Sequence, residues 1–282
     1  MGKITKQSLF IVGLARSGTT LLRDLLNNHP KVKLSQLETR LFPYMDNLIK
    51  GFGNLKNKKN FKKFYNRIVK TTYFLYQDEL KIKKIDAETW YNRCKEFTTA
   101  EIFKQLILHD IKIEENDEII WGDKTPSYIS NVKLIKQTYP NAKIVHIIRD
   151  VRDVCLSNRK RWGNNIYRVA NKWDKKLKEF HKQIKEFKED VYELEYESLL
   201  KNTKEQVKNI CIFLNIDYKE GMEKPSRITE IFGDAKNLKK IKKDNLEKFL
   251  KELEPKEILK IESIAYYNLK KFEGNVLNYL EN

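Results

Sequence analysis

The feature that most constrains this chain is a short apolar run that passes through a glycine-bounded loop into an amphipathic helix. Residues 8–12 are almost entirely apolar, Gly13 and Gly18 bracket four residues, and the stretch from about 18 to 28 carries leucines at helical spacing. A loop at a helix N-terminus presents backbone N–H groups and the positive end of the helix dipole to an anion. The pattern therefore predicts a phosphate-binding loop between a strand and a helix.

The loop departs from the nucleotide-binding pattern G-x-x-x-x-G-K-[ST] at one position. Thr19 stands where that pattern has lysine, and Arg16 places a cation inside the loop instead. The lysine normally reaches the bridge between the β- and γ-phosphates of a nucleotide. Its absence argues against ATP hydrolysis and favours a different phospho-anhydride as ligand.

Composition sets broad limits on the protein class. The 282 residues are 40% hydrophobic, enough for a substantial core, and the formal net charge of +17 favours anionic partners. The excess charge is mostly lysine spread over predicted helices, which is a weak indication of nucleic-acid binding. We therefore expect no nucleic-acid partner.

Cysteine content and hydropathy bear on the compartment. Cys94, Cys155 and Cys211 are widely spaced and follow no metal-ligand pattern, so we expect neither a disulfide framework nor a zinc site. The first predicted strand begins within about ten residues of Met1, and no apolar run reaches the length of a membrane span. These features predict a soluble cytoplasmic protein without stable membrane insertion.

The remaining chain alternates between predicted strands and helices. Strands are predicted at 8–12, 32–34, 119–121, 143–148 and 191–194, and helices at 18–28, 42–115, 152–161, 166–188, 203–214 and 245–273. Within these runs, Phe61 and Phe64 fall on one helical face, Gly122 to Pro126 indicate a turn that ends the third strand, and Pro255 marks a new helix start. This alternation predicts one α/β domain over residues 1–282, with a parallel sheet flanked by helices, a helical insertion at about 42–115 and a helical C-terminal region. Ligands of such sheets lie beyond the carboxyl ends of the strands, where segments 13–20, 122–126, 149–161 and 195–197 fall.

A second anion site is predicted after the strand at 143–148. Arg149 follows this strand, and Ser157 and Arg161 lie four residues apart on the next helix and so share a face. Two guanidinium groups and a hydroxyl are suited to a terminal phosphate. The alternative is that Arg149, Asp150 and Asp153 only cap that helix and pair with one another at the surface.

With two predicted phosphate sites on one sheet, the chain resembles the sulfotransferases of the P-loop superfamily, which use 3′-phosphoadenosine 5′-phosphosulfate (PAPS). The family's 5′-phosphosulfate loop appears here as Ala15 to Thr20, which would bind through Arg16, Ser17, Gly18, Thr19 and Thr20. Its 3′-phosphate motif appears as Arg149 with Ser157, joined by Arg161. The sequence Arg-Ser-Gly-Thr-Thr-Leu, then His-Pro and Glu-Thr-Arg, is similar to the tyrosylprotein sulfotransferases and their bacterial relatives.

This resemblance implies transfer of the sulfuryl group of PAPS to an acceptor hydroxyl, with adenosine 3′,5′-bisphosphate (PAP) as product. Glu38 matches the branch's general base, and Lys124 a lysine that approaches the transferring group. Arg16 would bind the same region from the other side. The alternative for Glu38 is pairing with Arg40 or helix capping, and His109 is the rival base.

Other residues follow from the resemblance alone. Tyr196 matches a family tyrosine that contacts the nucleotide, although packing at a helix start explains it nearly as well. In the family, a basic C-terminal loop closes over the 3′-phosphate. The candidates for this loop here are Arg227, Lys242 and Lys243, and we assign Lys242 to the 3′-phosphate. No metal is expected, because a singly charged sulfuryl group needs fewer cations and no Walker-B carboxylate is evident.

The acceptor stays open at this stage. A tyrosine in an acidic peptide suits the positive charge and the Glu-Thr-Arg similarity, but a carbohydrate or small-molecule alcohol is equally compatible with the loop chemistry. Two alternatives to a sulfotransferase are an NTP-dependent kinase of the P-loop type and a basic nucleic-acid-binding protein. The first would hydrolyse ATP with Mg²⁺, and the second would bind nucleic acid with a steep salt dependence.

Overall fold

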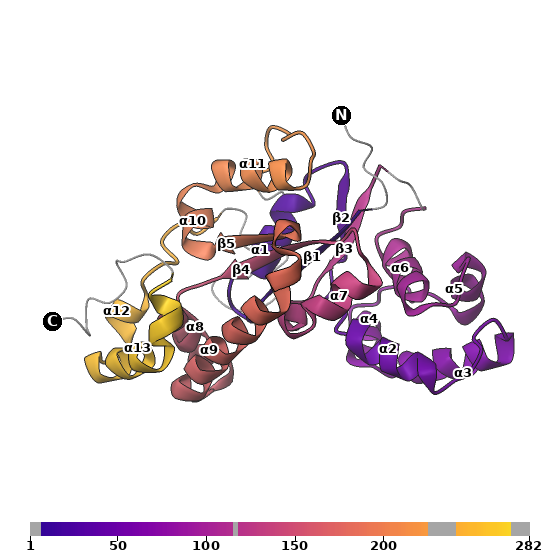
Figure 1. Cartoon of the computed structure of the whole chain (residues 1–282), viewed down its shortest axis with the longest axis horizontal. Coiled ribbons are helices and arrows are strands. Elements are labelled where there is room, and N and C mark those ends of the chain that lie inside the picture. The colour runs from indigo at the N-terminus through magenta and orange to yellow at the C-terminus, as the bar shows by residue number, and fades with distance from the viewer. Residues whose placement is uncertain (1–6, 115–117, 225–240, 272–282) are drawn as a thin grey trace.

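A five-stranded parallel sheet forms the centre of the computed structural model, which describes residues 7–114, 118–224 and 241–271. Its strands are β1 (Ser8–Gly13), β2 (Val32–Leu34), β3 (Ile120–Lys124), β4 (Lys143–Ile148) and β5 (Val191–Glu195). The order is β2-β3-β1-β4-β5, and every adjacent pair is parallel (Figure 1). The predicted α/β class and all five predicted strand positions are confirmed.

The order of the strands decides which loops meet. The chain passes from β1 to the β2-β3 side of the sheet and returns to place β4 on the other side of β1. The carboxyl end of β1 therefore lies between those of β3 and β4. Ligands bind at such a reversal of strand order, so this edge of the sheet is where the site is expected.

Strand β3 is longer than the sequence predicts. It continues through Gly122 and Asp123 to Lys124, pairing Phe10 with Asp123 and Ile11 with Lys124. At Gly122 an added Cβ would lie 1.8 Å from the Leu9 carbonyl oxygen, so only glycine fits there. The glycine that resembled a turn signal in the sequence instead permits close approach of two strands.

Helices cover both faces of the sheet. One face packs against α1 (Thr19–Leu26), α10 (Tyr196–Lys201) and α11 (Thr203–Phe213), with Leu22, Leu25 and Val207 among the buried residues. The other face packs against the helical insertion and against α7 (Val132–Thr138), α8 (Val151–Trp162), α9 (Ile166–Gln183) and α13 (Pro255–Leu269) (Figure 1). A 3-10 turn, η1 (Pro126–Ser130), leads from β3 to α7.

The predicted insertion at about 42–115 consists of separate short helices. They are α2 (Phe42–Lys50), α3 (Lys58–Ile68), α4 (Thr72–Glu79), α5 (Ala87–Arg93) and α6 (Thr99–Asp110). Asn57, Asp86 and Thr98 cap three of them by accepting hydrogen bonds from backbone N–H groups. Phe61 and Phe64, predicted on one helical face, are buried against Trp90.

The C-terminal helices differ modestly from prediction. Helix α9 ends at Gln183 and is followed by the 3-10 turns η2 (Ile184–Glu186) and η3 (Lys188–Asp190), so the predicted helix to 188 is too long. The run predicted at 245–273 contains α12 (Phe249–Glu252) and α13. Pro255 begins α13, as predicted, and Glu254 and Glu257 form its capping box.

Candidate functional site

The loop after β1 has the backbone geometry of an anion-binding loop. Arg16 and Gly18 have φ values of 76° and 88°, both in the left-handed region. Gly18 is the N-cap of α1 and has no side chain that could accept hydrogen bonds from the N–H groups of the first helical turn. At Gly18 a Cβ would lie 2.3 Å from a ring carbon of Tyr196. The loop therefore presents backbone N–H groups at a helix start and needs glycine to accommodate Tyr196.

Arg16 links this loop to the predicted 3′-phosphate motif. Its Nε donates to the Ser157 hydroxyl at 3.1 Å, across 141 residues of sequence, and an Arg149 guanidinium nitrogen donates to the Arg16 carbonyl oxygen at 3.3 Å. The two predicted anion sites are thus adjacent. In this structure the Arg16 side chain extends towards α8.

Arg149 occupies a buried, polar position. It forms an ion pair with Asp153 at 3.2 Å, and its guanidinium carbon lies 4.6 Å from the centre of the Tyr196 ring. Asp150 caps α8 by accepting from the Arg152 N–H at 2.8 Å. Asp150 therefore caps α8, as in the alternative, but the pair of Arg149 with Asp153 is buried and does not lie at the surface. Arg149 additionally contacts the loop.

Two buried polar atoms at this place have no hydrogen-bond partner. They are the Arg149 Nε and the Ser17 hydroxyl oxygen, the latter on a side chain that is 0% exposed. Native proteins rarely leave such atoms unpaired. A donor nitrogen and a hydroxyl left unpaired beside a helix start fit a site that takes an anion with several acceptor oxygens.

Asn245 is a residue that sequence reasoning missed. Its carbonyl oxygen accepts from Arg149 at 3.1 Å, and its side-chain nitrogen donates to the Tyr196 hydroxyl at 2.8 Å. The C-terminal segment therefore reaches the predicted 3′-phosphate motif through this asparagine. Lys242 is exposed three residues earlier, and Arg161 is exposed one helical turn beyond Ser157. Arg227 lies outside the described residues.

Glu38 is held between two cations at the carboxyl end of β3. Lys124 Nζ lies 2.8 Å from one carboxylate oxygen and 3.3 Å from the Thr20 hydroxyl, and Arg40 lies 2.8 Å from the other oxygen. Lys124 is almost fully buried, whereas the Arg40 side chain is 63% exposed. The structure thus brings Glu38, Lys124 and the phosphate-binding loop together, and the predicted pairing of Glu38 with Arg40 is also present.

The charge state of Glu38 follows from these neighbours. Burial by itself would raise the pKa of Glu38, but the charge and hydrogen bond of Lys124, followed by those of Arg40, outweigh burial, so the pKa lies below its ordinary value. Glu38 is therefore ionised at neutral pH. An ionised carboxylate is able to accept a proton from a nearby hydroxyl.

The backbone before Glu38 is tied to α1. Arg23 is buried, forms an ion pair with Asp24 at 2.8 Å and donates to the Gln36 carbonyl oxygen. The Ser35 N–H continues the sheet by donating to the Gly122 carbonyl oxygen at 3.1 Å. These contacts fix the path of the chain from β2 towards Glu38.

The histidines lie elsewhere. The pKa of His109 is lowered, first by burial and then by Arg93, and the other charges that act on it are those of Asp110, Asp86 and Lys83. None of these belongs to the group around Glu38. His29 hydrogen-bonds to the Asp217 carbonyl oxygen and accepts from the Lys31 N–H. Among the described residues, the charges that shift the pKa of the rival base His109 therefore do not include Lys124, Glu38 or Arg16.

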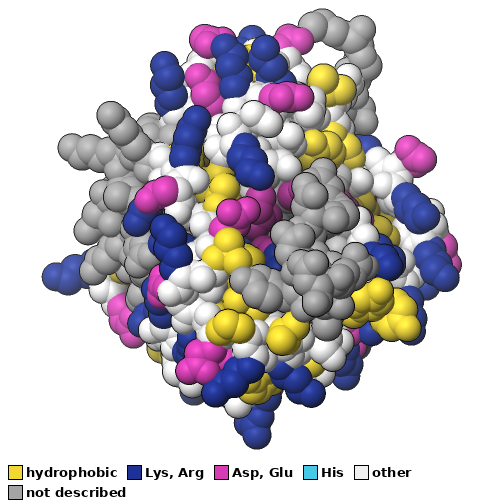
Figure 2. Space-filling model, turned by 90° about the vertical axis from the view of Figure 1, so that its left-hand side faces the viewer, with side chains coloured by type: hydrophobic (Ala, Val, Ile, Leu, Met, Phe, Trp, Pro, Cys, Tyr) yellow, Lys and Arg dark blue, Asp and Glu magenta, His cyan; other side chains and the backbone are white. Residues whose placement is uncertain are grey.

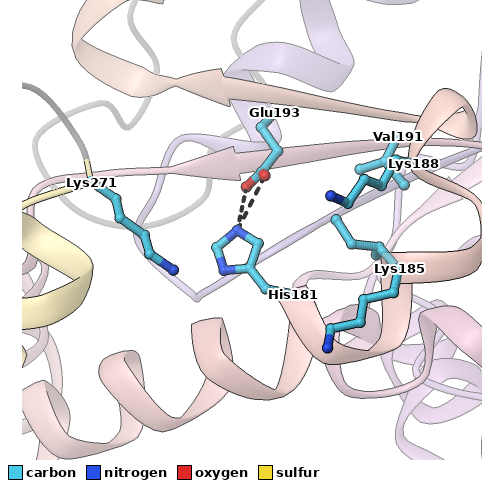
Figure 3. Close-up of a pocket in the computed structure, with 7 residues that line it drawn as sticks. His181, Lys185, Lys188, Val191, Glu193 and Lys271 are labelled. Carbon is cyan, nitrogen blue, oxygen red and sulfur yellow. Dashed lines mark hydrogen bonds and ion pairs between the residues drawn. The ribbon is translucent and has the colours of Figure 1, made fainter.

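His146 and His181 share one carboxylate away from this edge of the sheet. His146 Nδ1 and His181 Nε2 lie 3.0 and 3.1 Å from oxygens of Glu193. His181 and Glu193 line a cavity of about 430 Å³ towards the amino end of β5, together with Lys185, Lys188 and Lys271 (Figure 3). Burial lowers the pKa of His146 against the opposing effect of Glu193, to which its Nδ1 is hydrogen-bonded.

Acidic and basic side chains are mixed on one face of the molecule (Figure 2), and the cysteines lie in the interior. On the face shown in Figure 2, Lys and Arg side chains are interspersed with Asp and Glu and form no continuous stripe. Cys94, Cys155 and Cys211 are free and buried. Among the residues that the structure describes, no helix has both the length and the apolar composition of a membrane span.

Several known proteins resemble this chain in sequence. It is 25% identical to protein-tyrosine sulfotransferase A of Caenorhabditis elegans over 76% of the chain and 51% of that relative. It is 25% identical to the Drosophila melanogaster protein-tyrosine sulfotransferase, over 76% of this chain and 39% of that relative. It is 23% identical to an uncharacterised protein of Aquifex aeolicus, over 78% of this chain and 27% of that relative. The chain thus spans about half the length, or less, of these three relatives.

Two solved structures share the fold, and a family model matches most of the chain. The sulfotransferase domain of the Synechococcus PCC 7002 olefin synthase has a TM-score of 0.61 at 20% identity, covering 95% of this chain and 96% of that one. The sulfotransferase domain of the curacin biosynthetic pathway gives 0.60 at 18% identity, covering 93% and 96%. The model described as "Sulfotransferase family" matches residues 8–220. The chain therefore belongs to the sulfotransferase family.

Proposed function

We propose that this protein transfers the sulfuryl group of PAPS to an acceptor hydroxyl, with PAP as the second product. Membership of the sulfotransferase family supports the reaction type. The adjacency of the loop and the Arg149 motif supports a donor that carries phosphate groups at both ends of one nucleoside, because each motif takes one anion. The buried Arg149 Nε and Ser17 hydroxyl without partners fit such a donor.

The observation that carries the proposal is the position of Lys124. Its ammonium lies within hydrogen-bond distance of both the Glu38 carboxylate and the Thr20 hydroxyl of the loop. Lys124 therefore contacts both Glu38, the proposed base, and the loop that is proposed to bind the 5′ end of the donor. A cation at this junction favours the negative charge that develops during group transfer.

Each residue has a distinct task in this proposal. Bound PAPS would supply a sulfuryl group attached to a phosphate leaving group. Glu38 takes the proton of the acceptor hydroxyl as the new O–S bond forms and the S–O bond to the leaving phosphate breaks. Lys124, Arg16 and the loop N–H groups stabilise the charge on the sulfuryl oxygens and on the departing phosphate.

The remaining site residues hold the rest of the donor. Arg149, Ser157 and Arg161 bind the 3′-phosphate, Tyr196 contacts the nucleoside, and Lys242 approaches from the C-terminal segment. Ser17, Gly18, Thr19 and Thr20 complete the 5′ loop. No metal is part of this scheme, because side-chain cations meet the single charge of the sulfuryl group.

We further propose a tyrosine hydroxyl within an acidic peptide as the acceptor. The names of the C. elegans and Drosophila relatives support a protein tyrosine. The net charge of +17 favours an acidic partner through the field of the whole protein. The exposed Arg40, beside Glu38, provides a positive charge at the same place.

The test combines donor binding with transfer. PAP is titrated calorimetrically into the protein, and transfer from PAPS to an acidic tyrosine peptide is followed by mass spectrometry. We expect PAP to bind and Glu38→Gln to lose turnover by about a hundredfold or more while its PAP affinity stays within about twofold of wild type. Glu88→Gln, an exposed change on α5, is the control. Undetectable PAP binding at millimolar concentration would overturn the donor assignment, and retained turnover in Glu38→Gln would overturn the assignment of the base.

A further inference from the structure

A buried polar cluster lies directly beside Glu38 and has no part in the chemistry described above. Asp123 is 0% exposed and accepts hydrogen bonds from the hydroxyls of Thr39 at 2.5 Å and Thr125 at 3.1 Å. The Thr39 hydroxyl oxygen also lies 2.7 Å from the Tyr128 hydroxyl, which accepts from the Phe42 N–H at 2.8 Å. Since Thr39 gives its proton to Asp123, it accepts from Tyr128, and the donors and acceptors form one directed chain.

The cluster joins two segments at adjacent positions. Asp123 and Lys124 are consecutive in β3, so their side chains leave opposite faces of the strand. Lys124 binds Glu38, and Asp123 binds Thr39, the residue that follows Glu38. The end of β3 therefore holds the Glu38 segment from both faces of the sheet.

The held segment has a backbone that needs support. Arg40 has a φ value of 53°, in the left-handed region that a residue with a side chain rarely adopts. Its N–H points to the Thr125 hydroxyl at 3.4 Å, and Thr125 in turn donates to Asp123. Both threonine hydroxyls therefore converge on one carboxylate oxygen of Asp123 and hold the turn in which Glu38 lies.

We propose that Asp123 is a positioning residue that keeps Glu38 aligned with Lys124 by anchoring the hydroxyl of Thr39. The inference rests on the proposed function, since Glu38 is the base in that proposal. Asp123 is fully buried, so this proposal gives it no direct contact with the acceptor or the donor. Removal of the Thr39 hydroxyl changes neither the Lys124 nor the Glu38 side chain, but it weakens the support of the backbone that positions the Glu38 carboxylate. Small displacements of catalytic groups lower the rate strongly.

The experiment compares three variants. Thr39→Val removes the anchoring hydroxyl at nearly constant volume, and Thr39→Ser restores a hydroxyl. Thr203→Val is the matched control, because Thr203 is buried on α11 and donates to the Leu199 carbonyl oxygen at 2.8 Å, on the other face of the sheet. For each variant, kcat and KM for the peptide, PAP affinity, Tm and hydrogen exchange of the amides of residues 38–42 are measured.

We expect Thr39→Val to lower kcat by about tenfold to a hundredfold, with PAP affinity changed no more than in Thr203→Val. Its Tm should fall further than that of Thr203→Val, because Asp123 and the Tyr128 hydroxyl both lose a buried hydrogen-bond partner. Exchange of the amides at 40–42 should accelerate in Thr39→Val alone, and Thr39→Ser should recover most of kcat. If wild type binds PAP and transfers sulfate but Thr39→Val is as active as Thr203→Val, the positioning role is wrong. If wild type itself neither binds PAP nor transfers sulfate, the proposed function fails first, and faster exchange at 40–42 still reports whether Thr39 anchors the segment.

Discussion

The Nζ of Lys124 lies 2.8 Å from a carboxylate oxygen of Glu38, although 86 residues separate them in sequence. Lys124 ends β3 and Glu38 follows β2, the neighbouring strand in the sheet. Parallel pairing of these strands brings their carboxyl ends to one edge, where the ammonium can also reach Thr20 of the loop. The contact links the loop that we propose binds the 5′ end of the donor to an ionised carboxylate.

Removal of the Arg40 charge should shift the pH dependence of activity. Arg40 contributes to the lowered pKa of Glu38, after burial and Lys124. In Arg40→Gln the pKa of Glu38 rises towards its ordinary value, so a higher pH is needed to ionise the base. We expect the acidic limb of the kcat/KM profile to move to higher pH, as measured between about pH 4 and 8. Lys50→Gln, which removes the same charge from an exposed ion pair on α2, should leave the limb in place. An unmoved limb in Arg40→Gln would show that Glu38 does not set it.

Arg149→Lys should weaken binding of the 3′-phosphate specifically. Lysine retains the charge but loses the planar set of donors, and hydrogen bonds to charged groups contribute about 1.5–3 kcal/mol. We expect PAP affinity to fall about tenfold to a hundredfold, while the affinity for adenosine 5′-phosphate changes little. Calorimetry with both nucleotides measures the difference. Equal losses for the two nucleotides would contradict the assignment of Arg149 to the 3′ end.

Asp123→Asn should change how stability depends on pH. Burial raises the pKa of Asp123 to about 7, the hydrogen bonds from Thr39 and Thr125 lowering it only in part. Because the folded-state pKa exceeds the unfolded-state value, the folded protein holds an extra proton between about pH 4 and 7, and this carboxyl makes wild type less stable as pH rises through that range. We expect the free energy of unfolding of wild type to fall relative to Asp123→Asn by at most about 1.4 kcal/mol per pH unit, then to level off above pH 7. Urea unfolding of both proteins at several pH values tests this prediction. If the free energies of unfolding of wild type and Asp123→Asn changed in parallel with pH, the raised pKa of Asp123 would be contradicted.

Loss of the buried ion pair between α8 and α13 should destabilise the fold. Arg152 and Glu262 are 7% and 0% exposed, and Arg152 also lies over the Phe249 ring at 4.0 Å. In Arg152→Met the Glu262 carboxylate stays buried without its cation, which typically costs about 3–5 kcal/mol. The double variant Arg152→Met with Glu262→Met should recover much of this loss. Denaturant unfolding of the three proteins gives the values, and a single variant as stable as wild type would contradict the expectation.

Local sequence patterns predicted much of the fold. The alternating runs located all five strands, and Pro255 located the start of α13, because these signals depend on neighbouring residues only. The patterns failed where a partner elsewhere in the chain decided the outcome. Gly122 resembles a turn signal locally, yet it lies within β3 because the Leu9 backbone passes too close for any side chain.

The candidate site divides in the same way. Motifs after predicted strands indicated Arg16, Arg149 and Ser157, and the resemblance to the tyrosylprotein sulfotransferases indicated Glu38 and Lys124. The structure places all of them at one edge of the sheet. Asn245 carried no sequence signal, since its contacts with Arg149 and Tyr196 come from a distant segment. Asp123 is adjacent to Lys124 in the sequence, but its contact with Thr39, on the opposite face of β3 from Lys124, is seen only in the structure.

The sequence by itself determined that a glycine-bounded loop joins the first strand to a helix and that other polar motifs follow predicted strands, because strand, loop and helix signals are short-range. Only the tertiary structure decided that Lys124 contacts Glu38, that Arg16 reaches Ser157 and that Asp123 anchors Thr39. These pairings depend on the order β2-β3-β1-β4-β5, which is set by how the helices pack on the two faces of the sheet. The physical reason is that strand order is a property of long-range burial, and no local pattern encodes it.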